Sequence, residues 1–169
     1  MAAHHPDHPP ADDAGSRFVP PAARRAALET AAVHLRCPVC GEPVRLTVTQ
    51  LICGNGHGFD IARQGYVNLT AGRANPGTAD TATMIAAREE FLGRGHYRPL
   101  ARSLASLASG CEPSGEGLVV DLAGGTGYYL ARVLDALPAR HGACADLSAP
   151  ALRRAAGGTK REPASSAGG

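Results

Sequence analysis

The stretch CPVCGEPVRLTVTQLICGNGH, residues 37–57, decides the first part of the fold. It carries two pairs of candidate metal ligands, Cys37 with Cys40 and Cys53 with His57, and twelve residues separate the pairs. Zn²⁺ prefers four soft or borderline donors in a tetrahedron, and close ligand pairs on either side of a hairpin-length spacer are typical of structural zinc. Because protein side chains fill all four positions, the sequence predicts a closed, structural zinc site with no open position for catalysis.

Residues 35–70 are the expected extent of this zinc-binding β module. Val44, Leu46 and Val48 alternate with polar residues, which is the period-two pattern of a half-buried strand, and the return strand is expected at about residues 50–53. A module of about 35 residues buries too little surface to fold alone, so we expect the metal to supply much of its stability. The alternatives are chance cysteine clusters and a redox-active Cys-x-x-Cys pair.

The composition and the flanks of the chain narrow the remaining classes of protein. The 169 residues carry a net charge of +2, which is too small to indicate a nucleic-acid partner by itself. No apolar run is long enough to cross a bilayer, and the N-terminus has no apolar core, so neither a membrane segment nor a secretory signal is expected. We expect a reducing cytoplasm, where a Cys-x-x-Cys pair more often binds metal than forms a disulfide. Residues 1–34 and 157–169 are predicted to be a disordered leader and a disordered tail.

Residues 71–110 form the predicted helical linker. Two helices are expected in it, at about 81–92 and 99–108, with Asp80 placed to cap the first. The apolar residues at helical spacing are Met84, Ala87 and Phe91 in the first helix and Leu100, Leu104 and Leu107 in the second.

A second informative stretch is VVDLAGGTG, residues 119–127, which indicates a strand, a glycine turn and the start of a helix. Such a turn lets backbone amides approach a ligand closely at a helix N-terminus. Leu130 occupies the position where the dinucleotide fingerprint needs a third small residue, and no Gly-Lys-Ser/Thr is present. The turn therefore matches neither the complete dinucleotide motif nor a nucleoside-triphosphate loop.

Two acidic residues flank this turn. Asp121 lies at the end of the strand expected at 118–123, and Asp146 lies at the end of the next one, expected at 142–147. An acid about 20 positions after the glycines is placed to accept hydrogen bonds from a ribose. An adenosine ligand without phosphates would use the acids and tolerate the incomplete fingerprint, so S-adenosylmethionine fits better than NAD. The alternative is a helix–strand packing turn that holds no ligand.

From about residue 35 to residue 154 the chain resembles the bacterial 23S ribosomal RNA guanine-N1 methyltransferases, some of which confer macrolide resistance. Several separate motifs in the same order carry this resemblance. They are Cys-Pro-x-Cys at 37–40, Cys-x3-His-x-Phe-Asp at 53–60, Gly-Tyr-Val-Asn-Leu at 65–69, Arg-Glu-Glu-Phe-Leu-Gly-Arg-Gly-His-Tyr-Arg-Pro-Leu at 88–100, and the segment from Asp121 to Tyr129 that ends Gly-Thr-Gly-Tyr-Tyr.

The resemblance implies an α/β fold, with a small N-terminal zinc-binding β module followed by the N-terminal part of a Rossmann-like class I methyltransferase domain at 111–156. It implies Zn²⁺ and S-adenosylmethionine as cofactors. The implied metal ligands are Cys37, Cys40, Cys53 and His57. The residues implied to touch the methyl donor are Tyr97, Gly125 and Thr126, and those implied to shape its pocket are Asp121, Gly127 and Asp146. No catalytic residue is assigned.

The implied substrate is N1 of a guanine in a hairpin of 23S ribosomal RNA, and the second expected partner is another copy of the chain. Arginines near the module would be candidate RNA contacts; they are Arg36, Arg45, Arg63 and Arg73. The chain departs from the family at Ala123, where a glycine is common, and it stops soon after the second expected strand. We therefore expect a truncated and poorly active methyltransferase. The alternative hypothesis is a zinc-dependent RNA-binding module without catalysis.

Overall fold

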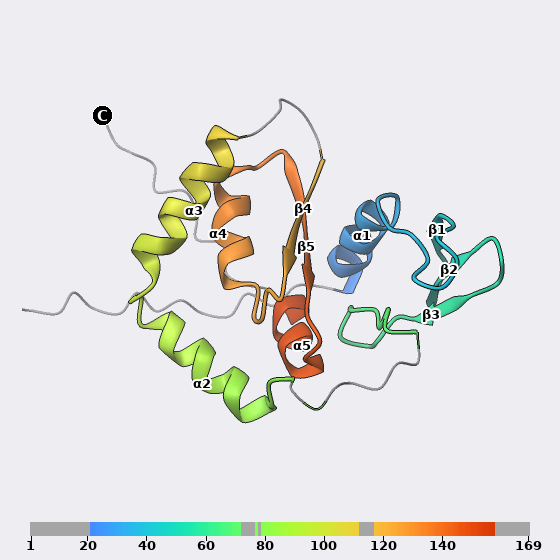
Figure 1. Cartoon of the computed structure of the whole chain (residues 1–169), viewed down its shortest axis with the longest axis horizontal. Helices are drawn as coiled ribbons and strands as arrows, with labels where there is room; N and C mark the ends of the chain where they lie inside the picture. The colour runs from blue at the N-terminus through green and yellow to red at the C-terminus, as the bar shows by residue number, and fades with distance from the viewer. Residues whose placement is uncertain (1–20, 72–76, 78, 112–116, 158–169) are drawn as a thin grey trace, which may run out of the picture.

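The computed structural model describes residues 21–71, 77, 79–111 and 117–157. In chain order its elements are α1 (Pro21–Ala32), β1 (Val44–Leu46), β2 (Gln50–Cys53), β3 (Gly58–Asp60), α2 (Ala82–Gly93), α3 (Arg98–Gly110), β4 (Gly117–Leu122), α4 (Tyr128–Ala136), β5 (Arg140–Ala145) and α5 (Ala149–Gly157). The first three strands form an antiparallel sheet, and β4 and β5 form a parallel pair (Figure 1). This arrangement confirms the predicted α/β class, with the small antiparallel β module of residues 35–70, called the ribbon below, in front of the parallel pair.

The antiparallel sheet is a hairpin extended by a third strand. Val44 pairs with Cys53 at one end of the β1–β2 ladder, and Leu51 pairs with Phe59 between β2 and β3. These side chains share a small core whose buried members are Ala32, Cys37, Val44, Leu51, Cys53 and Phe59. The predicted alternation was wrong at Val48, which is 82% exposed, because the chain already turns between Thr47 and Gln50.

Helix α1 corrects the prediction that residues 1–34 are a disordered leader. The segment PAARRAALETAA is helical, as its alanine content favours, and residues 1–20 lie outside the described part. Ala31 and Ala32 at the end of α1 are 7% and 5% exposed. The helix contacts both β1 and β5, so it lies between the ribbon and the parallel pair (Figure 1).

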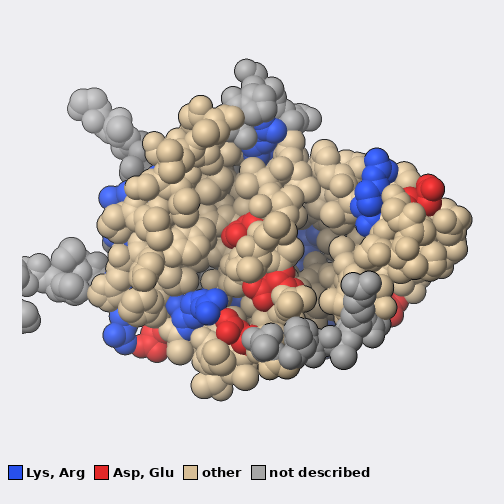
Figure 2. Space-filling model, in the orientation of Figure 1, with Lys and Arg blue, Asp and Glu red and all other residues tan. Residues whose placement is uncertain are grey.

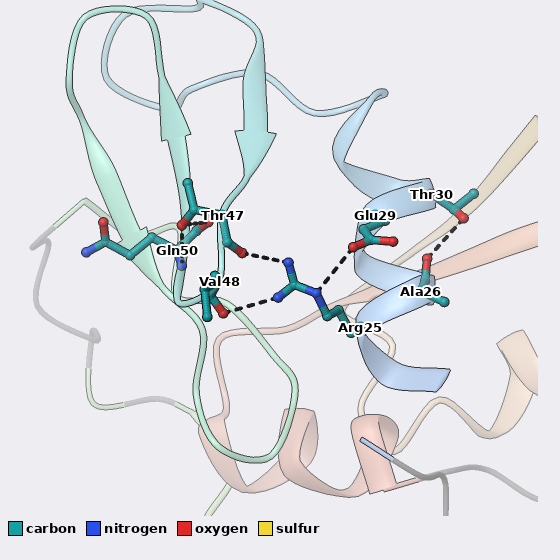
Figure 3. A network of polar contacts seen from close by, with 7 residues as sticks. All are labelled: Arg25, Ala26, Glu29, Thr30, Thr47, Val48 and Gln50. Atoms are coloured by element: carbon teal, nitrogen blue, oxygen red, sulfur yellow. Dashed lines mark hydrogen bonds and ion pairs between the residues drawn. The ribbon is translucent and has the colours of Figure 1, made fainter. Parts of the chain in front are cut away.

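Two arginines fasten α1 to the ribbon. Arg25 donates through Nη2 to the Thr47 carbonyl and through Nη1 to the Val48 carbonyl, both at 3.1 Å, and its Nε lies 3.2 Å from Glu29 (Figure 3). Arg24 donates to the Gln64 carbonyl at 3.2 Å. Carbonyls at a hairpin turn have no ladder partner, so a guanidinium from a neighbouring helix satisfies them.

We expect Arg25→Ala to loosen α1 from the ribbon. The substitution removes two charge-assisted hydrogen bonds, but the Arg25 side chain is 41% exposed, so solvent screening limits the loss to about 1 kcal/mol. Hydrogen–deuterium exchange should speed up in α1 and at residues 47–50. Arg45→Ala, an exposed change on the same module, is the control and should leave both segments unaltered. Equal exchange in the two variants would contradict a role of Arg25 in holding α1 against the ribbon.

The parallel pair is a β4–α4–β5 unit. Its register runs from Gly117 opposite Arg140 to Leu122 opposite Ala145, so both strands end at the same edge. Helix α4 contacts both strands, and α3 packs against α4. Because Gly142 lacks a side chain, Leu130 and Leu134 of α4 approach β5 closely.

The helices of the predicted linker exist, and the residues that they bury are not the apolar residues noted at helical spacing. Ala101 and Ala105 of α3 are buried at 1% and 9% exposure, because small side chains let α3 approach α4 closely. Ile85 and Leu92 are the buried residues of α2. The apolar residues at helical spacing are exposed: Met84, Ala87, Phe91, Leu100, Leu104 and Leu107.

The cap of α2 also differs from the prediction. Thr81, not Asp80, is the N-cap, and its side chain accepts a hydrogen bond from the Met84 amide at 3.3 Å. Asp80 pairs with Arg88 instead, at 3.0 Å. Ser148 caps α5, and its side chain accepts a hydrogen bond from the Ala151 amide at 3.2 Å. Within residues 21–71, 77, 79–111 and 117–157, no helix has the length and apolar character needed to span a membrane.

Candidate functional site

Two tight turns present the four predicted metal ligands. In the first, the Gly41 amide donates to the Cys37 carbonyl at 2.8 Å. In the second, the Gly56 amide donates to the Cys53 carbonyl at 3.1 Å. Gly41 and Gly56 have φ values of +76° and +81°, which glycine adopts without strain. These turns fold each ligand pair back so that its side chains point to one place.

The four donor atoms meet in one cluster. The Sγ atoms of Cys37, Cys40 and Cys53 and a ring nitrogen of His57 all lie within 4.8 Å of one another. The Cys40 and Cys53 sulfurs are 3.7 Å apart, and Cys53 Sγ is 3.4 Å from His57 Nδ1. Zn–S bonds of about 2.3 Å in a tetrahedron place sulfurs roughly 3.8 Å apart. A disulfide needs about 2.05 Å, so the spacing fits a tetrahedral metal and not an S–S bond.

Hydrogen bonds and burial set the protonation of this cluster. The Glu42 amide is the main cause that lowers the pKa of the Cys40 thiol to about 6. Burial opposes ionisation of Cys53, but hydrogen bonds from the His57 amide and imidazole outweigh it and lower the pKa of that thiol. Burial raises the pKa of Cys37, and the hydrogen bond to Cys53 raises the pKa of His57. The cluster therefore combines thiolates that attract a cation with protons that the cation must displace.

Zinc binding is accordingly expected to weaken as the pH falls. His57, with its raised pKa, holds a proton more firmly than a free histidine, and Zn²⁺ must displace that proton to bind the ring. Each displaced proton changes the affinity by about tenfold per pH unit, so we expect at least this slope between pH 7 and pH 5. Competition with a chelator of known affinity measures it. A pH-independent affinity over this range would contradict the assignment of His57 as a ligand.

The second candidate site lies where β4 and β5 end. The Asp146 carboxylate accepts from the Gly125 amide at 2.9 Å and from the Ser148 amide at 2.7 Å, and so ties the glycine turn to the start of α5. Each carboxylate oxygen keeps a further lone pair, so Asp146 can still accept a hydrogen bond from a ligand hydroxyl. Gly127 is the N-cap of α4, with φ +76°. The amides at the start of α4 therefore face the same place.

Asp121 lies beneath the turn. Its Oδ2 is buried without a hydrogen-bond partner, and burial, followed by the nearby Asp146 charge, raises the pKa of this carboxyl. A Cβ on Gly124 would come within 2.8 Å of that oxygen, so only glycine leaves room for it. Ala123 has a φ of +58°, a region that favours glycine, so the departure from the family pattern strains the backbone as well as adding a methyl group.

The remaining predicted residues surround the same turn. Thr126 is buried at 5% exposure between Gly125 and Gly127. Tyr97 lies just before α3, is 42% exposed and meets the Phe91 ring edge-on. Its charge contributes, after burial, to the raised pKa of Tyr129 on α4. Tyr97 is therefore partly exposed and close enough to Tyr129 of α4 to affect it electrostatically.

The sequence reasoning missed two residues beside the turn. Arg88 of α2 places Nη1 3.4 Å from the position that a Cβ of Gly125 would take. Cys144 lies 3.9 Å from the Gly125 carbonyl, and burial is the main cause that raises the pKa of its thiol to about 11. Neither spacing nor periodicity marks these residues, because a tertiary contact brings each to the turn. Only the location of Arg88 at the start of the 88–100 motif pointed to it.

Known proteins resemble this chain both in the ribbon and in the residues that follow it. Residues 35–71 match the family described as RlmA, N-terminal, a zinc ribbon. A protein of Micromonospora griseorubida, whose name assigns it to the 23S rRNA (guanine-N1)-methyltransferases, is 53% identical over 140 residues, covering 73% of this chain and 47% of the relative. The 23S rRNA (guanine(748)-N1)-methyltransferase of Streptomyces fradiae is 49% identical over 124 residues, covering 73% and 44%.

The chain thus spans about half the length of the curated relatives it matches. The zinc-ribbon match covers the ligand cluster and the antiparallel sheet, while the identity to the relatives extends well beyond the ribbon. The chain is thus similar to the RlmA N-terminal family over its zinc ribbon, and to two 23S rRNA (guanine-N1)-methyltransferases over the ribbon and well beyond it.

Proposed function

We propose that this chain supplies the zinc ribbon and the cofactor-binding turn of an S-adenosylmethionine-dependent methyltransferase that modifies N1 of a guanine in 23S ribosomal RNA. The observation that carries the proposal is the presence, in one chain, of the Cys37–His57 cluster and of a glycine turn flanked by acids at the ends of two parallel strands. The names of the two relatives supply the reaction and its substrate.

The residues of the turn have separate tasks in this proposal. Asp146 would accept hydrogen bonds from the ribose hydroxyls, and the amides at the start of α4 would face the polar end of the cofactor. Tyr97, Gly125 and Thr126 would contact it, while Asp121 and Gly127 would hold the shape of the turn. When bound, S-adenosylmethionine supplies an electrophilic methyl group. We expect positioning and charge stabilisation to contribute most of the rate, and no described residue is assigned as the base for guanine N1.

The ribbon is proposed to hold one Zn²⁺ and to contact the RNA hairpin. The side chains of Arg36, Arg45 and Arg63 are exposed on or beside it, while Arg73 lies outside the described residues. On the face shown in Figure 2 the charged side chains are scattered rather than gathered in one basic patch. The contact with RNA is therefore expected to depend on a few arginines and on shape more than on a broad electrostatic field.

The ribbon has a core of its own, which favours a second candidate function. Because the buried set around Leu51 closes without any residue of β4 or β5, the module could bind RNA without methyl transfer. Salt-dependent binding of a ribosomal RNA hairpin without methylation would indicate this function. A homodimer, the other expected partner, stays a prediction that sedimentation of the purified chain would test.

The first test combines three measurements on the purified chain. We expect one equivalent of zinc by mass spectrometry, S-adenosylmethionine binding by calorimetry, and slow methylation of 23S RNA that lacks the modification. Activity should be low, because Val120, Leu122 and Leu147 beside the turn are 51%, 76% and 57% exposed, and an open site excludes water poorly. Zinc without cofactor binding would leave the RNA-binding candidate in place and overturn the methyltransferase proposal for this chain.

A further inference from the structure

The guanidinium of Arg88 lies over the glycine turn although α2 precedes that turn by about 30 residues in the sequence. Arg88 Nη1 is 3.4 Å from the Cβ position of Gly125, and Gly125 is itself buried. The approach depends on the glycine, because a side chain at this position would occupy the space beside the guanidinium. A positive charge therefore lies at the turn that is proposed to bind the cofactor.

A closed series of contacts holds Arg88 in this place. Its Nη2 pairs with Asp80 Oδ2 at 3.0 Å, and the Asp80 carbonyl accepts from Ser148 Oγ at 2.7 Å. Ser148 is 1% exposed, and its amide donates to the same Asp146 carboxylate that holds the Gly125 amide. Helix α2 is thus fixed to the edge of the parallel pair where the turn lies, and Arg88 is positioned by the turn's own supports.

The guanidinium keeps donors for a ligand. A guanidinium has five N–H donors, and the ion pair with Asp80 uses Nη2. The Arg88 side chain is 48% exposed, so solutes reach it. Among the described residues, Asp80 is the carboxylate that pairs with Arg88. Nη1 therefore faces the turn with capacity to donate.

The charges around the turn define the ligand group that fits there. Asp121 and Asp146 lie at the strand ends and suit hydroxyls or a cationic group, whereas Arg88 on the α2 side suits an anion. S-adenosylmethionine carries both kinds of group, with ribose hydroxyls, an ammonium and a sulfonium, and one carboxylate. Resting on the proposed function, we propose that Arg88 binds the carboxylate of the methionine end of this cofactor, with Asp80 as its positioning residue.

The test compares two ligands and four proteins by calorimetry. The ligands are S-adenosylmethionine and decarboxylated S-adenosylmethionine, which lacks only the carboxylate. The proteins are the unmodified chain, Arg88→Gln, Arg88→Lys and the control Arg94→Gln. Arg94 lies on the same helix and pairs with Glu90. Circular dichroism of each variant checks that it folds.

We expect Arg88→Gln to weaken S-adenosylmethionine binding by about tenfold to a hundredfold, the range for a charge-assisted hydrogen bond. Binding of the decarboxylated ligand should stay within about twofold, Arg88→Lys should lose part of the affinity, and Arg94→Gln should bind both ligands like the unmodified chain. An equal loss for both ligands, or no loss for either, would overturn the inference and leave the proposed cofactor intact. If the unmodified chain binds neither ligand, the proposed cofactor site fails and the inference fails with it.

Should Arg88→Gln not fold, the comparison of Arg88→Lys with the unmodified chain decides the question. A lysine keeps the charge but not the two-pronged geometry, so its loss of affinity must be confined to the ligand that has a carboxylate. An affinity for S-adenosylmethionine that exceeds the affinity for the decarboxylated ligand by the same factor in both proteins would overturn the assignment.

Discussion

Replacing Cys53 by serine is expected to remove zinc from the protein and to unfold residues 35–70. Cys53 is 3% exposed, contributes both to the ligand cluster and to the core around Leu51, and pairs with Val44 in the ladder. A serine hydroxyl is a poor zinc ligand at neutral pH, and a module of this size depends on its metal to fold. Zinc content should fall from one equivalent to below about a tenth of one.

Metal analysis and hydrogen–deuterium exchange measure this outcome together. Exchange should rise throughout β1, β2 and β3, and a chelator should have the same effect on the unmodified chain. Cys111→Ser is the matched control, because this free and exposed cysteine lies at the end of α3 and outside the cluster. Retention of zinc with an unaltered exchange pattern in Cys53→Ser would disprove the tetrahedral site.

Gly124→Ala is expected to distort the glycine turn and abolish most cofactor binding. The added methyl group would lie 2.7 Å from Cys144 Sγ and 2.8 Å from Asp121 Oδ2, closer than real side chains approach. Overpacking of this kind costs about 1–3 kcal/mol of stability. Because the Gly124 amide also donates to the Ala145 carbonyl at 3.2 Å, a shift of the turn would pull it from β5. We expect affinity for S-adenosylmethionine to fall by at least about tenfold.

Ala123→Gly is the companion variant, one residue earlier. Its φ of +58° strains alanine but not glycine, so thermal unfolding should occur at a higher temperature than in the unmodified chain. Relative to the unmodified chain, the affinity measured by calorimetry and the unfolding temperature should therefore change in opposite directions in the two variants. Equal stability of Gly124→Ala and the unmodified chain would show that the turn accommodates a methyl group at this position, and it would contradict the prediction.

Local patterns were enough to predict several elements. The Cys-x-x-Cys and Cys-x3-His pairs placed the ribbon, because ligand spacing is read along the chain and the two turns that present the ligands are local. The strand before the glycines was predicted at 118–123 and lies at Gly117–Leu122, and the helix predicted to start after them lies at Tyr128–Ala136. Apolar runs, glycines and caps are short-range signals, so these elements needed no tertiary information.

The faces that the helices bury could not be read from the same patterns. Leu100, Leu104 and Leu107 have the spacing of a packed face, yet Ala101 and Ala105 are the buried residues of α3, which packs against α4. Helical periodicity shows that a face exists but not which neighbour covers it. Close approach of two helices is decided by side-chain volume on both, and α3 meets α4 through its small residues.

The sequence by itself therefore determined the ribbon with its four ligands, the strand–turn–helix with its flanking acids, and the resemblance to a family of ribosomal RNA methyltransferases. The tertiary structure decided that residues 21–32 are a helix clamped to the ribbon by Arg24 and Arg25. It also brought Arg88 from α2 onto the glycine turn, through Asp80 and Ser148. The physical reason is the range of the interactions. Ligand pairs and turns act over a few residues, whereas the hydrogen bonds of Arg25 to Thr47 and of Ser148 to Asp80 join residues 22 and 68 positions apart, which no local pattern records.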